Sequence, residues 1–360
     1  MTGSLIAPRQ LRRLGFLGYA NQPWWEATGW GHKVPGVAIT GGYDLDAETA
    51  SRTAFKVGTQ VFNTVEELVK ANDIIMIATP PGTHLDAAKQ CVAALRPRRR
   101  LVLLVQKPAT ASIADLLELA ALETPLVQIR VTHDRRWSVN RWITNQIEDG
   151  QIGTPESAIV RFVVPHCTDK LPGWFLDPKL AGGGAGMDLL PHPFDIAWRA
   201  LGRPEILGVR DASALRLDLP SDCPLEDTLR GTAIFRRSTG AEGEIRFEAS
   251  WAADAMDMSY EIKGSDGTAR LWAEPTAQDV GFRGHIVGGD SELSPREENQ
   301  PELWQCRGMQ AAAAAVLYEQ LVDGEEPTDE LVRVVESGVS LRTSLTAYKS
   351  AELGRFVELV

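Results

Sequence analysis

The sequence has few cysteines, and no two of them lie close together. Four cysteines, at positions 91, 167, 223 and 306, are scattered through 360 residues, and no C-x-x-C pair occurs. Structural zinc sites and disulfide frameworks use closely spaced cysteines, so the pattern argues against both and is typical of a reducing compartment. We therefore expect a cytoplasmic protein without a metal site.

Long hydrophobic runs and an excess of positive charge are also absent. No segment approaches the roughly 20 apolar residues of a membrane-spanning helix, and residues 1–13 lack the apolar stretch of a signal peptide. Lysine and arginine number 37 against 48 aspartates and glutamates, a net charge of −11. The basic cluster RPRRR at 96–100 is interpreted as a solvated helix end. We expect neither a membrane nor a nucleic-acid partner.

The first 130 residues alternate between two hydrophobic patterns. Apolar runs such as 73–79 and 101–106 are typical of strands buried on both faces, whereas 83–95 and 112–123 have the period of amphipathic helices. This alternation implies right-handed β-α-β crossovers. The sequence therefore predicts an α/β protein whose first domain, residues 1–132, is a Rossmann-type doubly wound parallel sheet.

The hydrophobic pattern of the sequence changes after about residue 155. Strand-like runs such as 242–252 and 258–264 follow one another without helices, and turn signals such as GSDGT separate them. This succession predicts an α+β second domain, residues 133–360, with a large, mostly antiparallel, open-faced sheet. The family resemblance described below implies that this domain binds substrate and forms the oligomer.

The end of the chain combines a turn-rich segment with helical patterns. Residues 274–300 are rich in turn and charged residues, which predicts a long exposed loop. Helices are expected at 302–324 and 328–354, and the last either stays in the second domain or packs back on the first. The alanine run 311–315 predicts a tightly packed helix face.

The stretch LGFLGYANQPWW at 14–25 has an apolar run that leads into a glycine, as in a dinucleotide-binding turn. The G-x-G-x-x-G pattern reads here as Gly18, Ala20 and Pro23, so one glycine of three is present. A plain strand end explains the stretch equally well. Pro23 suits a first helical turn, where its missing N–H would be unpaired anyway.

An acidic residue follows the second strand-like run. Asp44 stands where a carboxylate would accept both ribose hydroxyls of an adenosine. The carboxylate would repel a 2′-phosphate, and Leu45 rather than an arginine follows it, so NAD is favoured and NADP is the alternative. A helix N-cap is the other interpretation, which fits Asp46 better than Asp44.

Two further strand ends carry polar residues. IATPPGTH at 77–84 and QKP at 106–108 follow buried runs, and ligands of open α/β sheets bind at the carboxyl ends of strands. Lys107 directly follows an apolar run and is predicted to be functional, with a solvated loop lysine as the alternative.

The densest cluster is LAGGGAGMDLLPH at 180–192. Asp188 and His192 stand four residues apart, which suits a base with its orienting acid or two metal ligands. The metal interpretation is the weaker one, because no other cluster supplies obvious ligands. Pro191 and Pro193 indicate a helix that is just starting. The triple glycine is interpreted as backbone that passes close to a ligand or to the sheet.

These motifs together resemble the glucose-fructose oxidoreductase / inositol dehydrogenase / rhizopine catabolism (Gfo/Idh/MocA) family over nearly the whole chain. The resemblance rests on IATPPGTH, on QKP for Glu-Lys-Pro, on EDGQIGTP, and on AGGGAGMDLLPH for GGG-x-x-x-D-x-G-x-H. EEPTDE and AYKSAELGRFVEL fit the family's carboxyl-terminal pattern. The departures are the degraded glycine fingerprint, Gln106 for glutamate, and Leu190 for the glycine between Asp188 and His192.

The resemblance implies reversible hydride transfer between nicotinamide C4 and a secondary alcohol or hemiacetal carbon of a sugar, polyol or related glycoside. His192 would accept the hydroxyl proton, Lys107 would polarise the oxygen, and Asp188 would orient its neighbours. The implied cofactor contacts are Gly18, Tyr19, Ala20, Asn21, Asp44, Ala78, Thr79, Pro80, His84, Gln106 and Lys107.

Further substrate residues are suggested by side-chain chemistry, since aromatic faces and charged donors suit sugars. Besides Lys107, Asp188 and His192, these candidates are His133, Arg136, Trp174 and Phe175. Trp24 and Trp25 are expected to reach the nicotinamide or the substrate.

Two other functional classes remain open. One is a non-redox enzyme of the same fold that uses bound NAD internally. The other is a catalytically inactive NAD-binding regulatory protein, which the eroded fingerprint favours and the complete set of Lys107, Asp188 and His192 opposes. The resemblance also implies a homodimer or homotetramer that buries the open sheet face.

Overall fold

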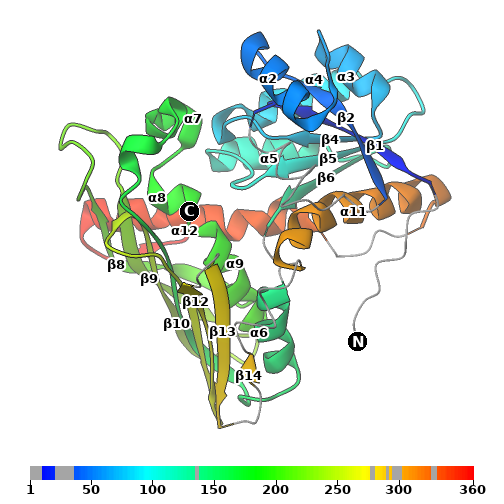
Figure 1. The fold of residues 1–360 in the computed structure, drawn as a ribbon. Coiled ribbons are helices and arrows are strands. Elements are labelled where there is room, and N and C mark those ends of the chain that lie inside the picture. The colour runs from blue at the N-terminus through cyan, green and yellow to red at the C-terminus, as the bar shows by residue number, and fades with distance from the viewer. Residues whose placement is uncertain are drawn as a thin grey trace. The chain divides into compact units, whose positions relative to one another are not determined.

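The computed structural model describes residues 10–20, 36–133, 138–275, 280–288, 292–293, 302–325 and 331–360 (Figure 1). Contacts divide the chain into two compact units. The first comprises Met1–His133 with Trp304–Ser337, and the second comprises Asp134–Leu303 with Gly338–Val360. The chain therefore returns to the first unit near its end. The sequence assigned residues 133–360 to a second domain and left open a return of the last helix to the first.

The first unit is built on a seven-stranded sheet in the order β15-β6-β5-β4-β1-β2-β3. Six strands are parallel, and β15 pairs antiparallel with β6 at one edge. The parallel strands follow the Rossmann order 3-2-1-4-5-6, which confirms the predicted doubly wound sheet. The strands are β1 (Arg12–Leu17), β2 (Val37–Tyr43), β3 (Gln60–Val61), β4 (Ile74–Ile77), β5 (Leu101–Gln106), β6 (Val127–Thr132) and β15 (Val332–Arg333).

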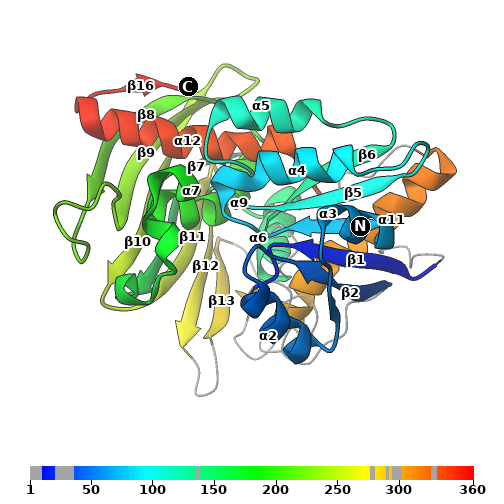
Figure 2. The ribbon, with the colours of Figure 1, turned by 90° about the horizontal axis from the view of Figure 1, so that it is seen from above.

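Helices cover both faces of this sheet (Figure 2). Ala313–Ala315 pack against Phe16 and Met76, which confirms that the alanine run is a closely packed helix face. On the opposite face, Leu68 lies against Gly15. The helices are α2 (Ala47–Val57) and α11 (Glu302–Asp323) on the first face, and α3 (Val65–Ala71), α4 (His84–Ala93) and α5 (Ile113–Ala121) on the second. Strands β4 and β5 are buried from both sides, as their continuous apolar sequence predicts.

The second unit contains a nine-stranded sheet in the order β14-β13-β12-β11-β7-β10-β9-β8-β16. Its neighbouring strands are antiparallel except for β10 and β7, so the predicted, mostly antiparallel sheet is confirmed. The strands are β7 (Pro155–Pro165), β8 (Glu205–Leu215), β9 (Thr228–Arg236), β10 (Glu242–Ala253), β11 (Asp257–Gly264), β12 (Thr268–Pro275), β13 (Val280–Val287), β14 (Glu292–Leu293) and β16 (Val357–Glu358).

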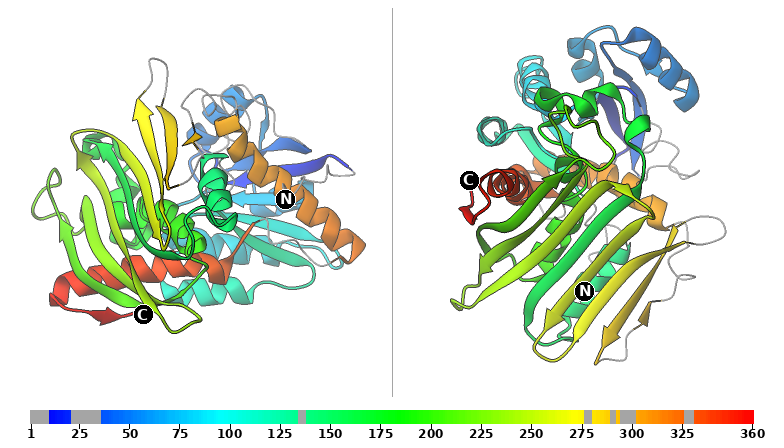
Figure 3. Two further views of the ribbon diagram at one scale, coloured as in Figure 1. Left: turned by 90° about the horizontal axis from the view of Figure 1, so that it is seen from below. Right: turned by 90° about the vertical axis from the view of Figure 1, so that its left-hand side faces the viewer.

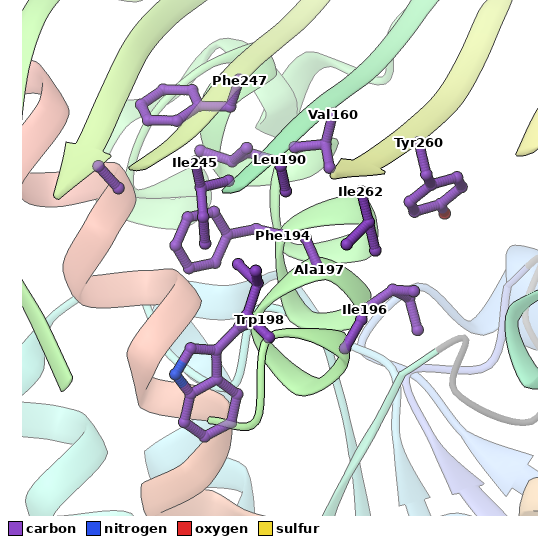
Figure 4. Packing of buried hydrophobic residues seen from close by; sticks show 14 of the residues in the cluster. Val160, Leu190, Phe194, Ile196, Ala197, Trp198, Ile245, Phe247, Tyr260 and Ile262 are labelled. Carbon is purple, nitrogen blue, oxygen red and sulfur yellow. The ribbon is translucent and has the colours of Figure 1, made fainter. Parts of the chain in front are cut away.

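The helices of the second unit cover one face of this sheet. Phe194 and Ala197 pack among Val160, Ile245 and Tyr260 of the strands (Figure 4). The helices are α6 (Ser138–Glu148), α7 (Pro178–Ala181), α8 (Ala185–Asp188), α9 (Pro191–Ala200) and α12 (Val334–Leu353), the last of which begins in the first unit.

The other face of the second sheet carries charged side chains in cross-strand pairs. Arg161 lies 2.8 Å from Glu248, and Arg270 lies 2.9 Å from Glu261. Ile159 stands among these residues with 42% of its surface exposed. The right-hand view of Figure 3 looks onto the strands of this sheet.

One sequence expectation is wrong in part. Residues 274–300 were predicted to form a long exposed loop, yet Val280–Val287 form β13, which pairs with β12 from Pro275 to Thr268. The sequence concealed this strand because, among the residues of β13 whose side chains are described, buried Phe282 and Ile286 alternate with the more exposed Arg283, His285 and Val287. Within the described residues, no helix is long and apolar enough to cross a membrane.

Candidate active site

The first strand of the first unit ends at Gly18, beside the end of β4. Gly18 has φ +88°, and a Cβ there would come within 2.7 Å of the backbone of Ala78 and Thr79. The Ala78 amide donates to the Leu17 carbonyl at 2.8 Å, so the two strand ends are joined. Only glycine fits this turn. The strand order reverses between β1 and β4, which is where open α/β sheets bind dinucleotides.

Asp44 lies at the same edge, at the end of β2, and is partly exposed. Its carboxylate accepts the amide of Tyr19 at 2.7 Å and the amide of Asp46 at 2.9 Å. Asp46, not Asp44, caps helix α2, by accepting the amides of Glu48 and Thr49. Two amides use half of the acceptor capacity of the Asp44 carboxylate, which leaves oxygen lone pairs for ribose hydroxyls. The turn and this acid therefore fit the adenosine half of NAD.

Two predicted cofactor contacts have their side chains inside the protein. The ring of Tyr19 is fully buried, its hydroxyl pairs with Thr59, and burial raises its pKa. His84 is also fully buried, with its ring nitrogens 2.7 Å from the Thr79 carbonyl and 3.1 Å from the Ala109 carbonyl. Burial lowers the pKa of His84, which favours the neutral ring. The side-chain contacts of these two residues hold the loops that follow β1, β4 and β5.

The remaining candidates of the first unit lie at strand ends. Gln106, the last residue of β5, accepts the Thr132 hydroxyl at 2.9 Å, so its amide links the ends of β5 and β6. Lys107 follows directly, is partly buried, and precedes Pro108 in a cis peptide. His133 follows Thr132 and is buried. Ala78, Thr79 and Pro80 at the end of β4 are partly exposed, and Ala20 is exposed.

Asp188 and His192 lie at the junction of two short helices in the second unit. Asp188 ends α8, and Pro191 and His192 open α9, which confirms the predicted helix start. Both side chains are partly exposed. The His192 ring packs edge-on against Phe162, with 5.4 Å between ring centres.

A buried carboxylate holds the glycine loop that leads to Asp188. Glu226, 4% exposed, accepts the amides of Gly184 and Gly186 at 3.0 and 2.9 Å and the hydroxyl of Tyr348 at 2.9 Å. A Cβ on Gly184 would lie 1.8 Å from the Glu226 carbonyl oxygen. The backbone at Gly184 therefore passes close to the connection between β8 and β9. Burial raises the pKa of both Glu226 and Tyr348.

An aromatic cluster connects two of the predicted substrate residues, Trp174 and Phe175, with Asp188. Trp174 and Phe175 stack with ring centres 3.9 Å apart, and Phe175 packs edge-on against Trp251 at 5.9 Å. The Trp251 indole N–H donates to the Asp188 carboxylate at 3.1 Å. Sequence reasoning missed Trp251, Glu226 and Tyr348, because each acts on a residue more than 40 positions away and no local pattern marks such a contact.

Several predicted residues lie outside the described part of the chain, namely Asn21, Trp24, Trp25 and Arg136. Among the residues that are described, no group of three or more histidine, cysteine, aspartate or glutamate side chains could hold a metal ion.

Two family profiles match the chain. Residues 13–131 match the profile described as "Oxidoreductase family, NAD-binding Rossmann fold", and residues 140–270 match the "GFO/IDH/MocA C-terminal domain". A 1,5-anhydro-D-fructose reductase of Ensifer adhaerens is 26% identical over 301 residues, which cover 82% of this chain and 83% of that protein.

Solved structures resemble the whole chain. The aldose-aldose oxidoreductase of Caulobacter crescentus, complexed with glycerol, gives a TM-score of 0.75 at 19% identity and covers 98% of this chain and 100% of its own. An inositol dehydrogenase homologue of Azotobacter vinelandii, complexed with NAD+, gives 0.76 at 16% identity and covers 98% of each chain. At these identities the likeness establishes the shared fold.

Proposed function

The chain belongs to the Gfo/Idh/MocA family of NAD-binding oxidoreductases, and from this premise we propose that it transfers a hydride reversibly between NAD and a secondary alcohol or hemiacetal carbon of a sugar, polyol or related glycoside. The first unit is the family's NAD-binding Rossmann domain. The second unit is proposed as the substrate-binding and oligomerisation domain.

The observation that carries the proposal is the side-chain arrangement around Asp188 in the second unit. The Trp251 indole N–H donates to the Asp188 carboxylate. The Trp251 ring also packs against Phe175, which stacks with Trp174. A fixed carboxylate beside aromatic faces suits a polyhydroxylated ring, which offers hydroxyls at its edge and C–H groups on its faces. Two of the similar proteins, the anhydrofructose reductase and the aldose-aldose oxidoreductase, are named for carbohydrate substrates.

Each residue has a separate part in the proposed reaction. His192 accepts the proton of the reacting hydroxyl, a contribution of about 10²–10⁴-fold when the base is well positioned. Lys107 donates to the same oxygen and stabilises the charge that develops there. Asp188 orients the hydroxyl and the imidazole. NAD, when bound, supplies the hydride acceptor.

We propose that Asp44 makes NAD the preferred cofactor. Its carboxylate is fixed at the end of β2 by two amides and is partly exposed, so a 2′-phosphate would meet a negative charge there. The same carboxylate stabilises the turn at Gly18, and its replacement should therefore affect both the affinity and the choice of cofactor.

We further propose a homodimer or homotetramer formed through the charged face of the second sheet. On this face Ile159 is exposed among Arg–Glu pairs, so it offers an apolar side chain and charges of both signs to a second copy of the chain. A reducing cytoplasm is the proposed compartment, supported by the free thiols of Cys91, Cys167 and Cys223.

The test is turnover with NAD+ or NADH over a panel of aldoses, polyols, anhydro sugars and glycosides, followed by NADH absorbance. His192→Ala should lower kcat about 10²–10⁴-fold and leave NAD affinity unchanged, because His192 lies outside the NAD-binding unit. His285→Ala, at an exposed position on β13, is the matched control. Unchanged kcat in His192→Ala would remove the assigned base.

Other outcomes of the panel decide between the functional classes. Product formation without net NADH change would indicate a non-redox enzyme that uses NAD internally. NAD binding without turnover of any compound would indicate a regulatory protein.

A further inference from the structure

Trp251 lies near the end of β10, where the pairing with β7 becomes irregular. Ser250 pairs with Val163 and Ala253 with Pro165, so Trp251 and Ala252 together oppose one residue of β7. Such a bulge bends a strand and changes the direction of a side chain, and bulges are frequent beside active sites. The irregularity occurs at the residue whose side chain reaches Asp188.

The main chain of Trp251 is held on both sides. Its amide donates to the Asp227 carbonyl at 2.8 Å, and its carbonyl accepts the Cys167 amide at 3.2 Å. Asp227 is itself fully buried. The backbone of Trp251 therefore has little freedom to rotate.

The side chain of Trp251 is fixed as well. It is 1% exposed, and Phe175 packs edge-on against its ring. An indole N–H can donate a hydrogen bond but cannot accept one, so its contact with a carboxylate oxygen has a fixed direction. A rigid donor at 3.1 Å confines one oxygen of Asp188.

We propose that Trp251 is a positioning residue for the proposed reaction: its indole N–H holds the Asp188 carboxylate in the orientation that turnover requires. The inference rests on the proposed function, because Asp188 acts there on the hydroxyl and the imidazole. Trp251 is 1% exposed, so its role is positioning and not direct contact with substrate. Its contact with Phe175 also joins the aromatic pair to the carboxylate, so substrate stacked on Trp174 and Phe175 would meet an acid of fixed direction.

The decisive variant is Trp251→Phe, which keeps an aromatic ring in the core and removes the indole donor. A hydrogen bond to a charged group predicts a fall in kcat of about ten- to hundredfold. The Kd for NAD should not change, since the first unit binds NAD.

Trp198→Phe is the matched control. Trp198 is also buried, and its indole N–H donates to the Pro204 carbonyl at 2.8 Å, away from Asp188. Both variants lose one indole hydrogen bond in the same unit. The control should show a comparable loss of thermal stability and a kcat within about twofold of wild type, below the loss expected for a charged bond. An equal fall in kcat in the two variants would overturn the proposal.

A double-mutant cycle separates positioning from general packing. In an Asp188→Ala background, Trp251→Phe should cause little further loss of kcat, because the oxygen that accepts the indole N–H is already gone. Additive losses would show that Trp251 acts independently of Asp188 and would overturn the proposal.

A readout without turnover distinguishes this proposal from the proposed function. In protein with ¹⁵N-labelled indole groups, the Trp251 N–H resonance, assigned by its loss in Trp251→Phe, should move upfield in Asp188→Ala while the Trp198 resonance stays in place. If the wild-type protein turns over no compound, the proposed function fails, whereas this resonance still tests the contact. An unmoved Trp251 resonance would overturn the positioning contact whatever the activity.

Discussion

Tyr348→Phe tests whether the glycine loop depends on the buried carboxylate beneath it. The change removes one hydroxyl and keeps the ring in place. That hydroxyl donates at 2.9 Å to Glu226, which is 4% exposed, so the lost contact is a hydrogen bond to a buried charged group. Such bonds contribute about 1.5–3 kcal/mol. The amides of Gly184 and Gly186 remain on the carboxylate, so we expect about 2 kcal/mol.

The assay is the free energy of unfolding measured at several pH values. For a unit of this size, 2 kcal/mol corresponds to a fall in Tm of about 4–8 °C. Burial raises the pKa of Glu226 above its ordinary value of 4.5, so the stability contributed by this group is fully present below pH 4.5 and is lost as the pH rises through the raised pKa. The Tyr348 hydroxyl lowers that pKa and reduces the loss. The stability gap between wild type and variant should therefore widen with pH and close in acid.

A matched change elsewhere provides the control for this pH dependence. Tyr19→Phe also removes a phenolic hydroxyl from a buried ring, but its partner is the neutral hydroxyl of Thr59. The stability gap for Tyr19→Phe should be constant over the same pH range. A pH-independent gap for Tyr348→Phe, or a gap below about 0.5 kcal/mol, would refute the hydrogen bond to ionised Glu226.

Two further predictions concern the cofactor and the assembly. Asp44→Asn should weaken NAD binding and reduce the preference for NAD over NADP, because it removes the charge that repels a 2′-phosphate; fluorescence titration with both cofactors measures this, and an unchanged preference would contradict the ribose role. Ile159→Glu should lower the molar mass in solution by placing a charge within the proposed interface, beside Arg246 and Glu261, as measured by light scattering, with Leu117→Glu on the exposed part of α5 as control. A wild-type monomer, or an unchanged mass in Ile159→Glu, would contradict the proposed interface.

The parts of the fold that the sequence predicted are those governed by local hydrophobic period. Residues 74–77 and 101–106 are continuous apolar runs and form the central buried strands. The alanine run of α11 was correctly interpreted as a packing face, but nothing in its period shows which sheet it covers. The chain returns to the first unit there because Ala313–Ala315 complete the core around Phe16. Such a return depends on contacts that are distant in sequence, and a linear pattern does not record them.

In the candidate site, too, some features follow from the local sequence and others from contacts between residues that are distant in sequence. Gly18 could be placed at a turn from its sequence, and its positive φ and contact with Ala78 supply the physical reason for glycine. His84 belongs to a recognisable motif, and its buried ring lies between two backbone carbonyls, so it joins the loops that follow β4 and β5. A sequence motif indicates that a position requires a particular residue type. It does not show whether that residue contacts a ligand or supports the neighbouring residues.

Asp188 shows why that distinction matters for the chemistry. Its backbone follows a loop held by Glu226, and its side chain is held by Trp251, so two buried residues from different strands and connections determine where the carboxylate lies. Neither residue belongs to the motif that identifies Asp188. Leu190 replaces a glycine of that motif and is fully buried in the core beneath α9. The substitution therefore adds packing at the helix junction while Asp188 and His192 remain partly exposed, so the departure from the family pattern is compatible with a functional pair.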